Sequence, residues 1–147
     1  MSNANKARAV ATRYLSRKDL DRLLRLGRGL ETKWKKADVV DFLSRKHTRG
    51  FGVDDGPENL VGCLLLDFSK EKCCVVYLVV DPDYRRLGYG TVLLECAEKF
   101  AAEKDEGLPL VVVAPDGALD MHLFLKANGY KGTSKGETCL FEKSRAI

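Results

Sequence analysis

The sequence is poor in the residues that build metal and disulfide frameworks. Its 147 residues include two histidines, and its five cysteines show no paired Cys-x-x-Cys spacing. This excludes the paired ligands typical of zinc sites, and the odd number of cysteines excludes a fully paired disulfide framework. We therefore expect no metal site and reduced, buried thiols. The cysteines are Cys63, Cys73, Cys74, Cys96 and Cys139.

Long hydrophobic runs are also absent. No apolar run approaches the roughly 20 residues that a membrane-spanning helix needs, and residues 1–6 lack the apolar segment of a targeting peptide. We expect a cytoplasmic protein without membrane contact. With 45% hydrophobic residues, the length is sufficient for a hydrophobic core, so we expect one domain over residues 1–147, as a monomer or homodimer.

Acidic residues are scarce in the first third of the chain. Residues 1–50 hold 14 Lys and Arg against 5 Asp and Glu, whereas residues 51–147 hold 11 against 16. Such a basic region can attract an acidic partner, although a solvated helix face has the same pattern. Since Tyr14 and Trp34 are the only aromatic residues within the basic stretch of residues 13–36, we do not expect a nucleic-acid groove.

The spacing of apolar residues predicts a mixture of strands and helices in an α/β domain with a mixed sheet. The first helix is expected to begin at Ser16, because Ser16 and Asp19 have the spacing of a capping box. Further helices are expected over residues 35–45, 88–104 and about 119–127. Strands are expected over 7–15, 50–54, 60–68, 73–80 and 110–114, with a strand pair within 130–143. The segment 73–80 carries no charge, which predicts a strand buried on both faces.

The most informative segment is residues 79–91, where an apolar strand stops at a turn and a helix begins after a basic, glycine-bearing loop. Arg85 and Arg86 precede Gly88 and Gly90. Backbone N–H groups at the helix start can then face an anion without a Cβ in the way, and the helix dipole adds positive potential. We expect a diphosphate here. The loop lacks the Gly-Lys-Ser/Thr of a nucleotide P-loop and the first glycine of a dinucleotide fingerprint.

The residues Arg85-Arg86-Leu87-Gly88-Tyr89-Gly90 fit the pattern (Gln/Arg)-x-x-Gly-x-(Gly/Ala). Together with the strand before it and the helix after it, this segment resembles the GNAT superfamily of acetyl-CoA-dependent N-acetyltransferases. The similarity extends to residues 14–20 and 124–130, and it is closest to the subgroup that acetylates protein N-termini, including a ribosomal-protein alanine. The resemblance implies a mostly antiparallel mixed sheet of six to seven strands, splayed at strands 4 and 5 and flanked by about four helices. It also implies acetyl-CoA as acyl donor and a primary amine, either a protein N-terminus or a small amine, as acceptor.

The same resemblance assigns cofactor binding to the end of the fourth strand and to the loop. The pantetheine arm is expected along the strand end, where an N–H near Leu78 or Val79 bonds the thioester carbonyl, and the diphosphate is expected on the loop N–H groups. The ten residues are Leu78, Val79, Val80, Arg85, Arg86, Leu87, Gly88, Tyr89, Gly90 and Thr91.

Several polar side chains that relatives use are replaced here. Val113 matches a fifth-strand glutamate, Leu125 matches the tyrosine that serves as general acid, and Ala118 matches a helix-start asparagine. The fourth-strand positions where a carboxylate is expected hold Cys74 and Val76. General acid–base help is typically worth about 10²- to 10⁴-fold in rate. Two hypotheses follow: an N-acetyltransferase that works by direct attack of the amine, or a weakly catalytic CoA-binding GNAT module that acts as a sensor or interaction partner.

Other side chains are candidates for proton transfer. Tyr77 and Cys74 lie on the expected central strand and are taken as the catalytic candidates, while Asp116 and His122 follow the fifth strand. Each has a structural alternative: a packed aromatic for Tyr77, a buried small residue for Cys74, a helix cap for Asp116 and a surface position for His122. Trp34 lies where the family receives its acceptor, or else anchors a helix to the core.

Overall fold

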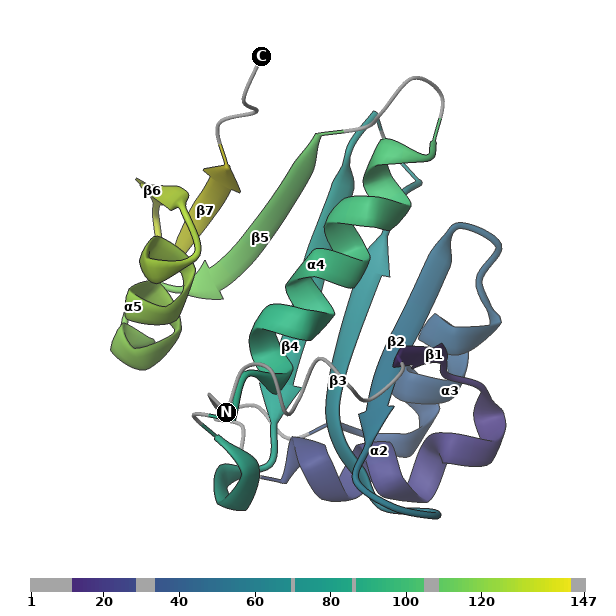
Figure 1. Cartoon of the computed structure of the whole chain (residues 1–147). Coiled ribbons are helices and arrows are strands. Elements are labelled where there is room, and N and C mark those ends of the chain that lie inside the picture. The colour runs from purple at the N-terminus through teal and green to yellow at the C-terminus, as the bar shows by residue number, and fades with distance from the viewer. Residues whose placement is uncertain (1–11, 29–33, 70, 86, 105–108, 144–147) are drawn as a thin grey trace.

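A single sheet of seven strands organises the computed structural model, which describes residues 12–28, 34–69, 71–85, 87–104 and 109–143 (Figure 1). The strand order is β1-β2-β3-β4-β5-β7-β6. Within the described residues every neighbouring pair is antiparallel except β4 and β5, which run parallel. The mixed, mostly antiparallel sheet expected from the sequence is confirmed.

The elements follow the expected order closely. The strands are β1 (Thr12–Tyr14), β2 (Thr48–Asp54), β3 (Leu60–Asp67), β4 (Cys73–Val80), β5 (Leu110–Pro115), β6 (Tyr130–Lys135) and β7 (Thr138–Lys143). The helices are α2 (Leu20–Gly27), α3 (Lys36–Ser44), α4 (Tyr89–Ala102) and α5 (Leu119–Ala127), with short 3-10 turns η1 (Arg17–Asp19) and η2 (Pro82–Tyr84). The first strand is described only from Thr12, since residues 7–11 of its expected span lie outside the described ranges.

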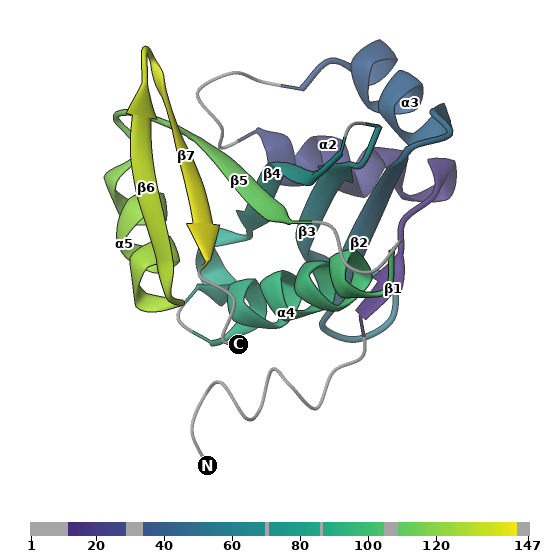
Figure 2. The same ribbon diagram turned by 90° about the horizontal axis from the view of Figure 1, so that it is seen from above.

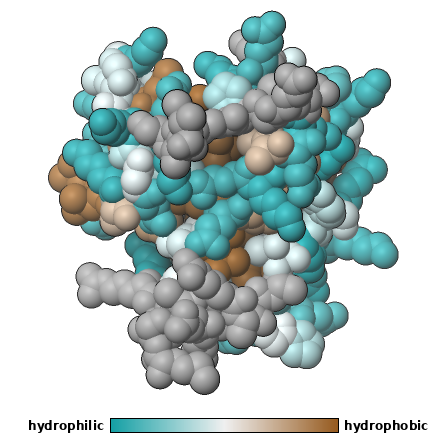
Figure 3. Space-filling model, turned by 45° about the horizontal axis from the view of Figure 1, so that its top comes forward, coloured by the Kyte–Doolittle hydropathy of each residue, from teal (hydrophilic) through white to brown (hydrophobic). Residues whose placement is uncertain are grey.

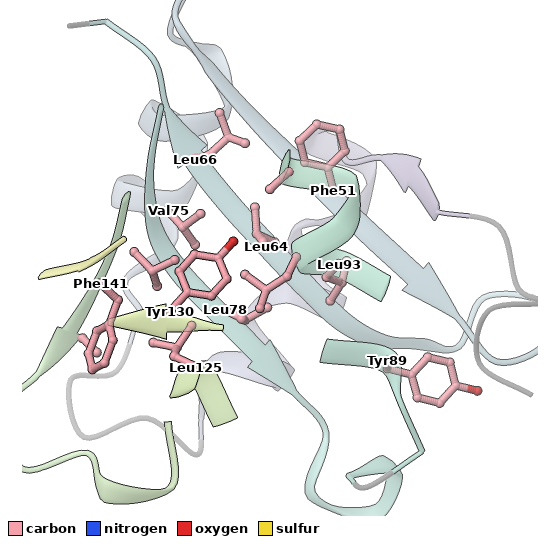
Figure 4. Close-up of a cluster of buried hydrophobic side chains, with 14 of the residues drawn as sticks. Phe51, Leu64, Leu66, Val75, Leu78, Tyr89, Leu93, Leu125, Tyr130 and Phe141 are labelled. Atoms are coloured by element: carbon pink, nitrogen blue, oxygen red, sulfur yellow. The ribbon is translucent and has the colours of Figure 1, made fainter. Parts of the chain in front are cut away.

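Helices cover both faces of the sheet. Seen from above, α4 lies against one face and α2 and α3 against the other, while α5 lies beside β6 and β7 (Figure 2). The face under α4 carries the larger buried cluster, to which Leu64, Leu78 and Leu93 contribute from β3, β4 and α4 (Figure 4). A second cluster, including Leu23, Val39 and Leu65, lies under α2 and α3.

The capping box expected at Ser16 is present, although the first turn is 3-10 and the α-helix begins at Leu20. The Ser16 hydroxyl accepts from the Lys18 N–H at 3.3 Å, and the Ser16 N–H donates to Asp19 Oδ2 at 3.0 Å. Asp19 also accepts two hydrogen bonds from Arg13. Burial by itself raises the pKa of Asp19, but these hydrogen bonds outweigh it and lower the pKa below its ordinary value.

Two apolar residues of the last expected helix are exposed. Leu119 and Leu123 have exposed fractions of 69% and 66%, while Leu125 of the same helix is fully buried.

On the face shown in Figure 3, hydrophilic residues predominate and hydrophobic residues form separate small areas. No helix within the described residues is long and apolar enough to cross a bilayer.

Candidate functional site

The two parallel strands at the centre of the sheet separate before they end. β4 pairs with β5 only from Cys73 to Val75, opposite Leu110 to Val112. Beyond these pairs β4 continues to Val80 and β5 to Pro115 without partnering each other, and the ribbons diverge (Figure 1). A gap therefore opens in the sheet on the carboxyl side of Val75.

A β-bulge in β4 lies at the start of the gap. Leu65 of β3 is opposite Tyr77 and the next residue, Leu66, is opposite Val75, so Val76 is an extra residue in β4. Val76 and Tyr77 consequently both lie on the face of α2 and α3, whereas Val75 and Leu78 pack under α4. A bulge bends its strand and increases the local twist, which accounts for the separation of β4 from β5.

The bulge also sets the direction of the backbone donors in β4. The N–H of Asp81 donates to Val61 O of β3 at 2.8 Å. Because the hydrogen-bonding direction alternates along a strand, the N–H of Val79 faces β3, while those of Leu78 and Val80 face the gap. The carbonyl of Val80 agrees with this direction, since it accepts from Arg85 Nε at 3.4 Å. Of the two backbone N–H groups expected to bond the thioester carbonyl, those of Leu78 and Val79, only that of Leu78 is directed into the gap.

The start of α4 lies next in the chain after this strand end and η2. Gly88 is the N-cap with a φ of +89°, a left-handed conformation that favours glycine. No side chain of the described residues caps this terminus, and the first turn carries no acidic residue. The exposed Arg85 precedes it. An uncapped helix N-terminus with a basic residue three positions before its N-cap fits a phosphate group. Arg86 lies outside the described residues.

Other residues of the expected loop serve packing. Tyr89 is buried, and burial raises its pKa. A Cβ on Gly90 would lie 2.9 Å from Phe124 Cζ, so this glycine permits the close approach of α5. The Thr91 hydroxyl donates to Asn128 Oδ1 at 3.2 Å, which joins the start of α4 to the end of α5. Leu87 is half-buried against the larger cluster.

The two catalytic candidates occupy different surroundings. Tyr77 is 38% exposed, so the expectation of a strand buried on both faces is wrong at this position. Its ring meets that of Trp34 edge-on, with the ring centroids 4.9 Å apart. Cys74 is half-buried and lies opposite Val111, in the part of β4 that still pairs with β5. Tyr77 therefore adjoins the gap, and Cys74 does not.

One structural interpretation made from the sequence is wrong. Asp116 does not cap α5, whose N-cap is Ala118; instead Asp116 Oδ1 accepts from Cys139 Sγ at 3.2 Å. This hydrogen bond, with burial, raises the pKa of Cys139. His122 lies partly exposed at the surface of α5, as expected, with Nε2 2.9 Å from Pro115 O and its ring against Phe141.

The sequence did not reveal a hollow of about 260 Å³ between α3 and β4. Its lining residues are Trp34, Asp38, Val39, Asp41, Phe42, Arg45, Leu65 and Tyr77. A Cβ on Gly27 would lie 2.7 Å from the Trp34 ring, so this glycine lets the indole lie against the end of α2. The available signal was the spacing of Asp38 and Asp41, which places both carboxylates on one face of α3.

The fold matches those of known proteins. The profile of the acetyltransferase (GNAT) family matches residues 17–130. The PaiA N-acetyltransferase of Thermoplasma acidophilum, solved with coenzyme A, is similar with a TM-score of 0.80 and 21% identity over 92% of this chain and 99% of that one. Arabidopsis thaliana NAA60, solved with a bisubstrate analogue, is similar with a TM-score of 0.77 and 14% identity over 90% of this chain and 95% of that one. The ribosomal-protein-S18-alanine N-acetyltransferase of Escherichia coli is similar with a TM-score of 0.74 and 15% identity over 94% of this chain and 96% of that one. No curated protein matches by sequence.

Proposed function

This chain belongs to the acetyltransferase (GNAT) family, whose co-substrate is acetyl-CoA, and we propose that it transfers an acetyl group to a primary amine. The observation that carries the proposal is the gap after Val75, which opens beside the uncapped start of α4. One feature supplies a backbone donor and the other an anion site. Acetyl-CoA brings an acetyl group already activated as a thioester.

We assign the diphosphate to the start of α4 and the pantetheine arm to the end of β4. The N–H groups of the first turn, from Gly88 to Thr91, face no acidic side chain of that turn, and Arg85 adds positive charge. Along β4, Leu78 and Val80 direct polar backbone groups into the gap, where they are available to the amide groups of a pantetheine arm. Arg86 is included among the residues that bind the diphosphate on the basis of the sequence pattern alone.

The N–H of Leu78 is the donor that we assign to the carbonyl oxygen of the thioester. Negative charge develops on such an oxygen when an amine attacks, and a fixed backbone donor stabilises it without reorganisation. Removal of one such donor typically costs about 3 kcal/mol in acyl-transfer enzymes.

We assign a role in proton transfer to Tyr77. Its partly exposed phenol is on the residue next to Leu78 and adjoins the gap. The positions that relatives fill with acids and bases hold Val113 and Leu125, neither of which exchanges protons. The attacking amine has to be neutral when it reacts. As the C–N bond forms, the C–S bond of the thioester breaks and CoA leaves as the thiol, and the proton that the nitrogen loses passes through Tyr77 or through solvent.

The second candidate function is a CoA-binding module with little catalysis. It is favoured by the same two apolar positions together with Ala118, because loss of acid–base help lowers the rate without removing the cofactor site. This candidate shares the start of α4 with the first, and only turnover separates the two.

The decisive comparison is Gly88→Asp against Gly88→Asn. Both variants place a side chain of the same size at a φ of +89°, so they share any backbone strain and differ in one negative charge. We expect the Asp variant to bind CoA at least about tenfold more weakly than the Asn variant, because it sets a carboxylate against the phosphates.

Calorimetric titration with CoA measures this difference, and thiol release from acetyl-CoA with a panel of amines measures turnover. Equal CoA affinity in the two variants would contradict the assignment of the diphosphate. CoA binding without thiol release above background, across peptides and small amines, would favour the binding module.

A further inference from the structure

The hollow between α3 and β4 has an aromatic wall. Trp34 and Tyr77 meet edge to face, and Phe42 lines the same space from α3. Tyr77 is held there by the bulge, which turns it to the face of α2 and α3, and Trp34 is held by its contact with Gly27. Aromatic faces of this kind attract cations through the ring quadrupole, and tryptophan does so best.

Carboxylates supply the remaining polarity of the hollow. Asp38 and Asp41 both line it, as does Arg45. Arg45 is committed to Asp41, with Nη2 2.6 Å from Oδ2. Asp38 has no ion pair within the described residues, so the charge of the lining is net negative. This local charge is opposite to that of the basic first third of the chain.

The hollow adjoins the place assigned to the reaction. Tyr77 forms part of its lining, and the next residue, Leu78, directs its N–H into the gap. A molecule whose reacting amine lies at Leu78 can therefore extend into the hollow past Tyr77. The hollow is lined by aromatic rings and by a carboxylate without an ion pair in the described part of the chain. The ligand group that best matches such a lining is a cation.

We propose that the hollow binds a second positive charge of the acceptor, a few carbon atoms away from the amine that is acetylated. This inference rests on the proposed acetyl transfer and specifies its acceptor class. The shared chemistry is that of a primary amine with a remote cation, whose source is either a small diamine or a peptide N-terminus followed by a basic residue.

A binding experiment tests the hollow without catalysis. Trp34 is the only tryptophan of the sequence, so tryptophan fluorescence reports on this wall alone. We expect 1,5-diaminopentane to change the emission at concentrations at least about tenfold lower than pentylamine, which has the same chain without the second charge. In Asp38→Asn this difference should shrink to less than about threefold.

Asp120→Asn is the matched control, because Asp120 is likewise an exposed acidic residue in the first turn of a helix, here α5. It should keep the wild-type preference. Equal responses to diaminopentane and pentylamine, or a preference that survives in Asp38→Asn, would overturn the inference.

Turnover separates this inference from the proposed function and identifies the source of the charge. We expect kcat/KM to favour diaminopentane over pentylamine, or alanyl-lysine amide over alanyl-norleucine amide, by at least about tenfold. A preference in the first pair assigns a small diamine, and one in the second assigns a basic peptide. Acetylation of all four at equal efficiency overturns the inference and leaves the transferase standing. If none is acetylated, the proposed function fails and the fluorescence titration alone decides the inference.

Discussion

Asp19 shows how one buried carboxylate is tied to several elements. Its oxygens accept from Arg13 of β1 and from the Ser16 N–H, and Arg13 also bonds Asp54 of β2. Asp19 is 3% exposed, whereas the Arg13 side chain is 37% exposed. The ion pair is therefore partly screened by solvent, and the capping hydrogen bond is the better shielded part of the arrangement.

Replacement of Asp19 by Asn should lower the free energy of unfolding at pH 7 by about 1–3 kcal/mol, because Arg13 loses one of its two charged acceptors. The folded-state pKa of Asp19 lies below its ordinary value. Its stabilisation is hence complete above that ordinary value, near pH 4, and is lost as the pH falls further. Denaturant unfolding at pH 7 and pH 3 should show a smaller wild-type advantage at pH 3. Asp21→Asn, an exposed change on α2, is the control, and an equal effect of both variants would refute the account.

Tyr77 carries the prediction for proton transfer. Tyr77→Phe should lower kcat by about 10²-fold or more while CoA affinity stays unchanged, since the ring and its contact with Trp34 are kept and only the hydroxyl is lost. Steady-state kinetics with a fixed amine acceptor measures kcat, and calorimetric titration measures the CoA affinity. Cys74→Ala, in the paired part of β4, should behave as wild type. An unaltered kcat in Tyr77→Phe would mean that the proton leaves directly to solvent.

At the scale of elements, the sequence predicted what hydrophobic period and capping determine. The capping box at Ser16 and the bounds of β4 were predictable, since both depend on neighbours in sequence. The bulge at Val76 was not, because residues 73–80 are apolar throughout and such a run does not show which face each side chain takes. The register with β3 decides that, and β3 is an equally uniform strand.

The end of the chain gives a second example. Leu119 and Leu123 were predictable as parts of a helix, but their exposure depends on how α5 rotates against the sheet. Gly90 and Phe124 set that rotation through a contact between residues 34 positions apart. The hollow beside Tyr77 was missed for the same reason, since Trp34 and Tyr77 meet only in the folded chain.

The cap at the start of η1, the turn that leads into α2, gives the prediction for this scale. Ser16→Ala should destabilise the protein by about 0.5–2 kcal/mol, because the N–H of Lys18 loses its acceptor. Ser44→Ala is the matched control, since the Ser44 hydroxyl bonds Val40 O near the end of α3 and caps no N–H group. Thermal unfolding of both variants measures the difference. Equal melting temperatures would show that the Ser16 hydroxyl contributes nothing to stability.

At the scale of the whole molecule, both faces of the sheet are closed by helices, and thiols report on this closure. Cys63 of β3 is fully buried, and burial raises its pKa to about 12. It becomes a reactive thiolate only when the core opens. Cys96, by contrast, is half-buried on α4.

We therefore expect iodoacetamide at pH 8 to label Cys96 in the native protein and Cys63 only through global unfolding. Mass spectrometry at increasing urea concentration should give a labelling rate for Cys63 that follows the unfolding curve. Rapid labelling of Cys63 in the absence of urea would show that β3 opens locally.

The interrupted pairing of β4 with β5 divides the sheet into two parts, β1 to β4 and β5 to β7. Three residue pairs of the β4–β5 ladder join the two parts. Because few residue pairs join the two parts, we expect the sheet to bend most easily along this line. Under the proposed function, acetyl-CoA bound between β4 and β5 contacts both parts and restricts their relative motion. We therefore expect bound acetyl-CoA to slow the hydrogen exchange of backbone amides on β7 as well, although β7 is separated from the gap by β5.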